Sequence, residues 1–111
     1  MREAAFGSSM DPVLLERVHA ELVSWGLMDA GEPRLSRRFR GAVARAAGRL
    51  QEREAAGDAP PGHPLENSIA LALSESELPV GAVATAEHRR FLFAVELASL
   101  PEGVRALLER E

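Results

Sequence analysis

The chain has 111 residues, of which 13 are basic and 17 acidic, so its formal net charge is −4. This length fits one domain, and a content of 46% hydrophobic and 27% charged residues is typical of a globular protein rather than of a disordered chain. Because cysteine is absent, disulfides, thiolate metal sites and cysteine nucleophiles are excluded. Tyrosine is also absent, and alanine, leucine, arginine and glutamate dominate, which favours helices over sheets. We therefore predict an all-α fold, a compact bundle of four to five helices.

Residues 1–10 lack the apolar core of a signal peptide, and no run of the sequence approaches the length of a membrane span. Gly7, Ser8 and Ser9 are typical of a flexible joint, so we interpret residues 1–10 as a flexible N-terminal extension. We expect a cytoplasmic protein without membrane contact, with a single helical domain over residues 11–111.

The first helix is predicted to begin at Asp11 and Pro12, because aspartate caps free amides and proline at the first helical position loses no hydrogen bond. Apolar residues then recur with helical spacing up to Trp25, the only tryptophan, which we expect to anchor the core. Residues 28–34 contain a glycine and a proline, which interrupt the pattern and predict a connection to the next helix.

The second predicted helix runs from about Leu35 to Glu54, with Ser36 as its cap, and concentrates the positive charge. Six arginines and no acid lie between Arg34 and Gln51, in a chain whose overall charge is negative. An apolar stripe on this helix is expected to face the core. Beside that stripe runs a line of arginines, namely Arg34, Arg38, Arg45, Arg49 and Arg53.

Residues 55–64 contain Pro60 and Pro61 and form the one predicted linker. This linker separates a helical hairpin over residues 11–54 from a second helical unit over residues 64–111. Neither unit has enough apolar residues to fold well alone, so we expect the two to pack together.

The second unit begins with a predicted helix at Pro64. Alternating apolar residues leave a short hairpin near 69–84 as the less favoured alternative, since alanine and leucine favour a helix. A further helix is predicted with Thr85 as its cap, and Pro101 begins a short last helix. The apolar residues of this last helix that we expect to face inward are Val104, Leu107 and Leu108.

No arrangement of residues predicts catalysis. Glycine-rich phosphate loops and the Gly-x-Ser-x-Gly setting of a serine nucleophile are absent, and Glu75 and Glu77 are interpreted as solvated acids at a helix end. Glu16 and His19 have the spacing of a ligand pair in di-iron helical bundles, but such sites need two copies and the chain has one. We therefore predict no enzyme activity, no metal site and no cofactor.

The arginine-rich helix carries the functional prediction. We predict a small interaction or regulatory protein that binds an acidic partner surface through residues 34–53. The residues assigned to partner binding are Arg34, Arg37, Arg38, Arg45, Arg49 and Arg53. The alternatives are internal pairing of these arginines with the chain's own acids, and nucleic-acid binding as a DNA-binding regulator of the helix-turn-helix type. The long connection between the helices, the acidic chain and the lack of stacking aromatic residues among the arginines argue against DNA.

Two surfaces favour a homodimer. Gly41, Ala44 and Gly48 share a helix face that a neighbouring helix, of the same chain or of a second copy, can approach closely. The helix after Thr85 carries a second apolar stripe, and we predict a possible dimer interface there, formed by Phe93, Leu97 and Leu100.

Overall fold

The computed structural model describes residues 11–82 and 84–109, which form five helices joined by loops. The helices are α1 (Pro12–Ser24), α2 (Arg37–Ala55), α3 (Pro64–Glu75), α4 (Ala86–Ala98) and α5 (Glu102–Glu109). The prediction of an all-α bundle of four to five helices is confirmed, and the described part of the chain contains no strand. Residues 64–75 are helical, so the hairpin considered near 69–84 does not form. The prediction for residues 1–10 lies outside the described residues.

Capping side chains fix where the helices begin. Asp11 accepts a hydrogen bond from the amide of Val13 at 2.9 Å, and Pro12 occupies the first turn of α1, as predicted. Ser36 and Thr85 are the N-caps of α2 and α4, and each accepts from the amide three residues later, also as predicted. Because such a cap satisfies an amide that has no partner within the helix, each stabilises its helix by about 1 kcal/mol.

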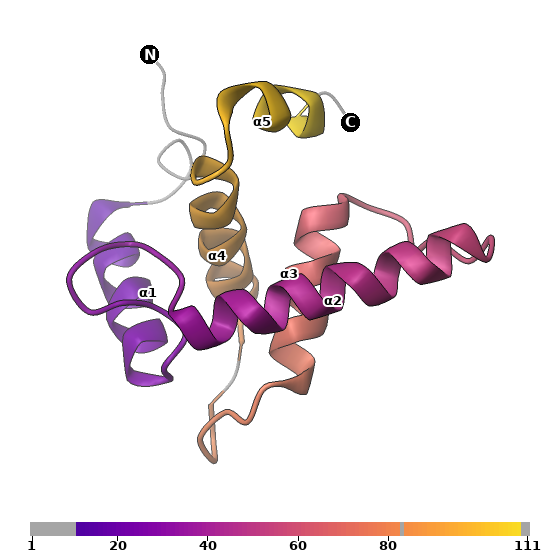
Figure 1. Cartoon of the computed structure of the whole chain (residues 1–111). Coiled ribbons are helices and arrows are strands. Elements are labelled where there is room, and N and C mark those ends of the chain that lie inside the picture. Colours follow the sequence, from indigo (N-terminus) through magenta and orange to yellow (C-terminus); the bar gives the residue numbers. More distant parts are fainter. Residues whose placement is uncertain (1–10, 83, 110–111) are drawn as a thin grey trace.

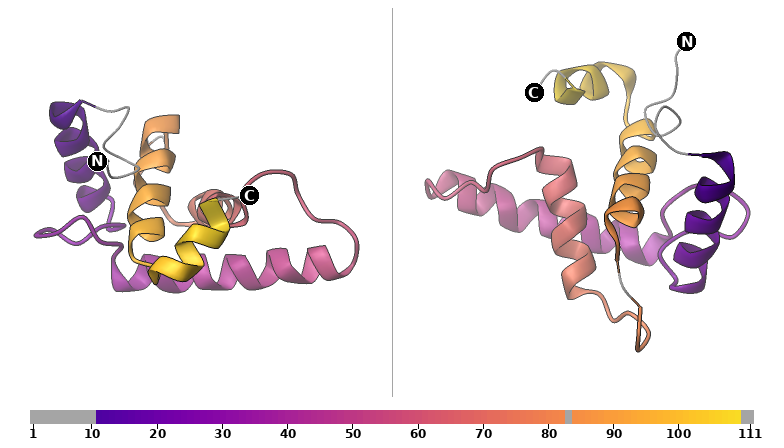
Figure 2. Two further views of the ribbon diagram at one scale, coloured as in Figure 1. Left: turned by 90° about the horizontal axis from the view of Figure 1, so that it is seen from above. Right: turned by 180° about the vertical axis from the view of Figure 1, so that it is seen from behind.

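The helices form two layers. Figure 2 shows α1, α4 and α3 on one side of the long helix α2, and Figure 1 shows that the C-terminal part of α2 extends beyond α3. The main helix contacts are those of α2 with α3, α3 with α4, and α1 with α4. The predicted units 11–54 and 64–111 are therefore held together by contacts between them, and α1 and α2 pack mainly on the second unit rather than on each other.

The core lies between the two layers, and its apolar residues come from α1, α2, α3, α4 and the loop between α1 and α2. Its largest fully buried side chains are Phe39, Leu22, Leu27, Leu35, Ile69 and Leu92. Trp25 is only partly buried at the edge of this core, beside His88, so it supports the core without being its centre. The long helix α2 contributes one stripe of apolar residues to the core, and the rest of its circumference carries polar and small residues.

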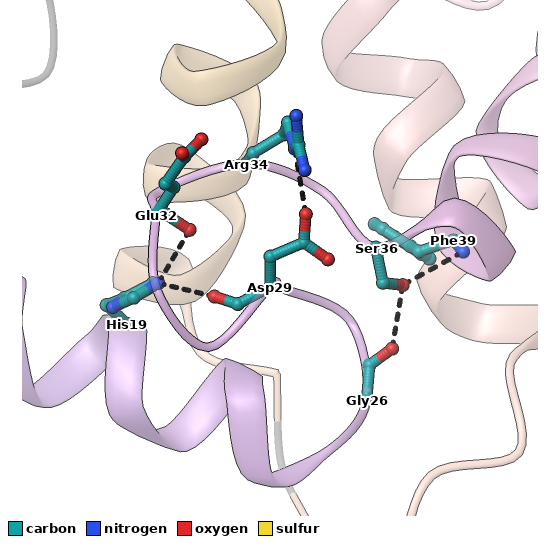
Figure 3. A network of polar contacts seen from close by, with 7 residues as sticks. All are labelled: His19, Gly26, Asp29, Glu32, Arg34, Ser36 and Phe39. Atoms are coloured by element: carbon teal, nitrogen blue, oxygen red, sulfur yellow. Dashed lines mark hydrogen bonds and ion pairs between the residues drawn. The ribbon is translucent and has the colours of Figure 1, made fainter.

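The loop between α1 and α2 is part of the core rather than a simple connection. Leu27, Met28 and Leu35 are buried, and an isolated antiparallel bridge joins Met28 to Leu35. The hydroxyl of Ser36 donates to the carbonyl of Gly26 at 2.8 Å, in addition to capping α2 (Figure 3). Gly26 has a φ of +82°, a left-handed conformation that favours glycine, so the chain can turn directly after α1.

The apolar residues of the last helix, α5, are more exposed than the sequence predicts. Val104 and Leu107, expected to face inward, are 46% and 57% exposed, so that prediction is wrong for both of them. Leu108 is partly buried, and its carbonyl accepts a hydrogen bond from His63 Nε2 at 3.1 Å. The sequence shows that α5 has an apolar face, but the spacing of residues does not identify which surface covers that face.

The small-residue face of α2 is open. A Cβ atom at Gly48 would have no neighbour within 4 Å, and one at Gly41 would meet only the guanidinium of Arg45, at 3.4 Å. Ala44, between them, is exposed. Since no helix among the described residues packs against this face, the expectation that a neighbouring helix of the same chain fills it is wrong.

Candidate functional site on the arginine helix

The six arginines assigned to partner binding are all exposed, but half of them have partners within the chain. The three ion pairs are Arg34–Asp29, Arg49–Glu75 and Arg53–Asp58. Arg34 lies before α2 rather than on it, and its Nε donates to Asp29 at 2.8 Å within the loop (Figure 3). Internal pairing therefore explains three of the six arginines, and it leaves the other three for a different explanation.

The remaining three are Arg37, Arg38 and Arg45, which make no ion pair or side-chain hydrogen bond with any residue in the described ranges. Arg40 was not among the arginines assigned to partner binding from the sequence, and it too forms no ion pair or side-chain hydrogen bond with a described residue. With 3.6 residues per turn, Arg37 lies nearly opposite the buried Phe39, whereas Arg38, Arg40 and Arg45 lie on the two flanks of α2, about 100–120° around the helix from Phe39. The outer side of α2 is therefore both uncovered and positively charged.

The charge of Arg40 is partly compensated within the chain. Arg40 lines a pocket of about 430 Å³ together with Glu96 of α4. The half-burial of Glu96 raises the pKa of its carboxyl group, and the positive charge of Arg40 offsets part of that rise. This electrostatic contact separates Arg40 from Arg37 and Arg38, whereas the positive charge of Arg45 acts in the same way on Glu75 and helps to lower the pKa of its carboxyl group.

A groove of about 490 Å³ lies between α2 and the C-terminal end of α3. Arg38, Arg45 and Arg49 line its α2 side, and Glu75 and Glu77 line its α3 side. The side chain of Arg49 spans to α3, where its Nη1 donates to Glu75 Oε2 at 2.6 Å and its Nη2 donates to Oε1 of the same carboxylate. The sequence places these arginines along one side of α2, but it does not show that the end of α3 lies opposite them.

The hydrogen bonds from Arg49 lower the pKa of Glu75, so this carboxylate is ionised at neutral pH. The interpretation of Glu75 as a solvated acid therefore missed its partner. The two residues are 26 positions apart in the sequence, and only the packing of α2 on α3 brings them together. Both side chains remain about half exposed, so the pair contributes little to stability.

Two of the histidines, His19 and His63, use their ring nitrogens in hydrogen bonds to the backbone of the chain. His19 Nε2 lies 3.1 Å from the carbonyl oxygens of both Asp29 and Glu32, so Nε2 carries the proton and donates (Figure 3). His63 Nδ1 accepts from the amide of Leu65 at 3.2 Å and thereby caps α3. These roles account for His19 and His63 without a ligand.

The third histidine, His88 in α4, is 5% exposed and borders a cleft of about 820 Å³. Its Nδ1 accepts from the amide of Thr85 at 3.0 Å, so Nε2 carries the proton and donates to Glu21 Oε1 at 2.5 Å. The ring centroid lies 4.8 Å from that of Trp25. Both nitrogens are thus engaged within the chain, and His88 joins α1 to α4.

The three residues predicted as a dimer interface do not form one open patch. Leu97 is 3% exposed, whereas Phe93 and Leu100 are partly buried. The ring of Phe93 also packs edge-on against His63, with centroids 4.9 Å apart. A second molecule can therefore reach the edges of Phe93 and Leu100 but not Leu97.

Within residues 11–82 and 84–109, no three histidine, aspartate or glutamate side chains gather in a way that could hold a metal ion. None of the helices in this part of the chain is long and apolar enough to cross a bilayer. Comparison with protein families, with curated proteins and with solved structures finds no match for this chain. We therefore infer function from the geometry and charge of α2 and its neighbours.

Proposed function

We propose that this chain is a small, non-enzymatic interaction or regulatory protein of the cytoplasm that binds an acidic surface of a partner protein through α2. The observation that carries this proposal is that Arg37, Arg38 and Arg45 are exposed and have no ion-pair partner among the described residues. Like charges three or four residues apart on a helix, such as Arg37 and Arg40 or Arg45 and Arg49, repel each other by a few tenths of a kcal/mol per pair. Carboxylates of a partner would remove that repulsion and accept charge-assisted hydrogen bonds from the guanidinium groups.

DNA is the alternative ligand for the same arginines, and two features favour a protein instead. The helices α1 and α2 do not pack mainly on each other, and their connection, residues 25–36, is longer than the three or four residues of a helix-turn-helix. Glu77, which forms no ion pair among the described residues, lies across the groove from Arg38 and Arg45, where it would repel a phosphate backbone.

The test measures binding to immobilised polyglutamate and to duplex DNA. The double variant Arg38→Glu/Arg45→Glu is compared with Arg17→Glu/Arg90→Glu, which changes the charge equally at exposed positions of α1 and α4. We expect the first variant to lose at least about 100-fold in affinity for polyglutamate, since each hydrogen bond to a charged group contributes about 1.5–3 kcal/mol. We expect the control to stay within about threefold of the parent, because charges beyond the screening length act weakly.

The thermal midpoint of each variant is measured alongside, and we expect it to stay near that of the parent because the reversed arginines are unpaired. An equal loss of affinity in both double variants would show that net charge, rather than α2, governs binding. Tighter binding to DNA than to polyglutamate, falling by about 0.9 log units per log unit of salt for each phosphate contacted, would support the DNA alternative. Unchanged binding by Arg38→Glu/Arg45→Glu would overturn both.

We also propose a homodimer, as a property separate from the acidic partner. Val104 and Leu107 of α5 are exposed, and His63 contacts both Leu108 of α5 and Phe93 of α4, so α5 adjoins the edge of the predicted interface. A second copy would cover these apolar residues. Light scattering over a dilution series should show a dimer that Leu107→Glu dissociates without changing the thermal midpoint of the monomer. A parent that stays monomeric at high concentration contradicts the homodimer.

A further inference from the structure

The groove between α2 and α3 offers apolar contact that the outer face of α2 lacks. Phe39 and Ala72 are buried at its floor, and Ala42 is half-buried there. Beside this floor stand the unpaired Arg38 and Arg45. Sites that combine an apolar lining with a few polar groups bind ligands that have both characters, since the apolar part contributes affinity and the charges fix the orientation.

Both unpaired arginines line this groove, and the side chain of Arg45 extends along α2 towards the turn that carries Arg38. Nη1 of Arg45 lies 3.4 Å from the position that a Cβ atom at Gly41 would occupy, so Arg45 reaches back along α2 by one turn. Gly41 leaves room for this orientation because it has no side chain. Since Gly41 lies between Arg38 and Arg45 in the sequence, this orientation brings the guanidinium of Arg45 towards the turn of Arg38, so both positive charges belong to one stretch of the groove wall.

The opposite wall limits what can enter. Both oxygens of Glu75 are held by Arg49, so this pair adds no net charge to the groove. Glu77 is exposed on the same wall and has no ion pair among the described residues. A continuous phosphate backbone would pass close to both carboxylates, whereas a peptide can place its own carboxylates on one side and uncharged atoms on the other.

We propose that this groove receives a short segment of the acidic partner protein in which an apolar side chain stands next to carboxylates. The apolar side chain lies over Ala42, and the carboxylates accept hydrogen bonds from Arg38 and Arg45. This assignment rests on the proposed function and specifies the chemistry of the partner segment and the surface that it occupies.

The experiment uses two fluorescein-labelled peptides on the full chain, and fluorescence anisotropy measures their binding. One peptide has a leucine between two pairs of glutamates, and its twin has a serine in place of the leucine. The parent is expected to bind the leucine peptide about tenfold more tightly, which corresponds to partial burial of one leucine side chain. This comparison needs no variant, so it stands even if a substitution prevents folding.

Two alanines of α2 provide matched variants. Ala42→Leu fills the groove, whereas Ala44→Leu adds the same atoms on the exposed outer face. We expect Ala42→Leu to lower the affinity for the leucine peptide by about tenfold, so that the leucine peptide and its serine twin bind equally well. We expect Ala44→Leu to change the affinity for neither peptide. Circular dichroism checks that both variants keep the helical content of the parent.

The outcomes separate this assignment from the proposed function. If neither peptide binds and polyglutamate does not bind either, the proposed function has failed. If both peptides bind equally, with Ala42→Leu and Ala44→Leu behaving alike, the acidic partner stands and the groove assignment is overturned. If duplex DNA displaces the leucine peptide from the parent more effectively than excess unlabelled peptide does, the peptide is the wrong class of ligand.

Discussion

Replacing Phe39 with alanine is expected to lower the free energy of unfolding by about 3–5 kcal/mol. Phe39 is 1% exposed and is the largest of the fully buried side chains. It lies in the first turn of α2, where it belongs to the same core cluster as Leu27 and Leu35 of the preceding loop. Truncation leaves a cavity that α2 and the loop can fill only in part, because each is held by its own cap and hydrogen bonds.

The measurement is the thermal midpoint and the urea midpoint of Phe39→Ala, with Phe93→Ala as the matched control. Phe93 is partly buried beside His63, so its loss removes less packing. We expect a fall in thermal midpoint of about 15 °C or more for Phe39→Ala and a clearly smaller one for Phe93→Ala. Equal falls would contradict the placement of the core under the N-terminal half of α2.

The helices could be predicted because the signals that define them are local. Asp11, Ser36 and Thr85 each cap a helix by accepting from an amide two or three residues away, and that geometry depends only on the nearby chain. The apolar period of α2 likewise identifies Phe39 and Val43 as core residues without reference to any other helix.

Whether each arginine forms an ion pair within the chain could not be predicted, because this depends on which acidic residues the packing of the helices places beside it. The sequence shows a line of arginines, yet only Arg49 forms an ion pair with Glu75 of α3, although Arg45 lines the same groove. The same limit explains the error at α5, where Leu107 belongs to a clear apolar stripe but no described residue covers it enough to bury it. Pairing and covering are properties of tertiary contacts, which residue spacing within one helix does not encode.

Replacing His88 with alanine is expected to lower the free energy of unfolding by about 3 kcal/mol, which is a large share of the stability of a domain of this size. His88 makes three contributions that alanine cannot replace. Its Nδ1 accepts from the amide of Thr85 in a capping box, its Nε2 donates to Glu21 of α1, and its ring packs on Trp25. Two of these contacts join α4 to the end of α1, so their loss also loosens the contact between those helices.

His88→Gln separates the contributions, since glutamine at this position of a capping box can accept from the amide of Thr85. We expect it to recover about 1 kcal/mol of the loss, which is the usual value of a cap, but not the ring contact with Trp25. Glu21→Gln should change stability little, because the Glu21 side chain is 59% exposed and an amide oxygen can still accept from Nε2. Chemical denaturation of the three variants measures these differences.

If His88→Ala lowers the free energy of unfolding by less than about 1 kcal/mol, the buried histidine does not join α1 to α4 as its contacts indicate. If the alanine and glutamine variants are equally unstable, the capping box contributes nothing, and the ring packing on Trp25 and the hydrogen bond to Glu21 account for the whole effect.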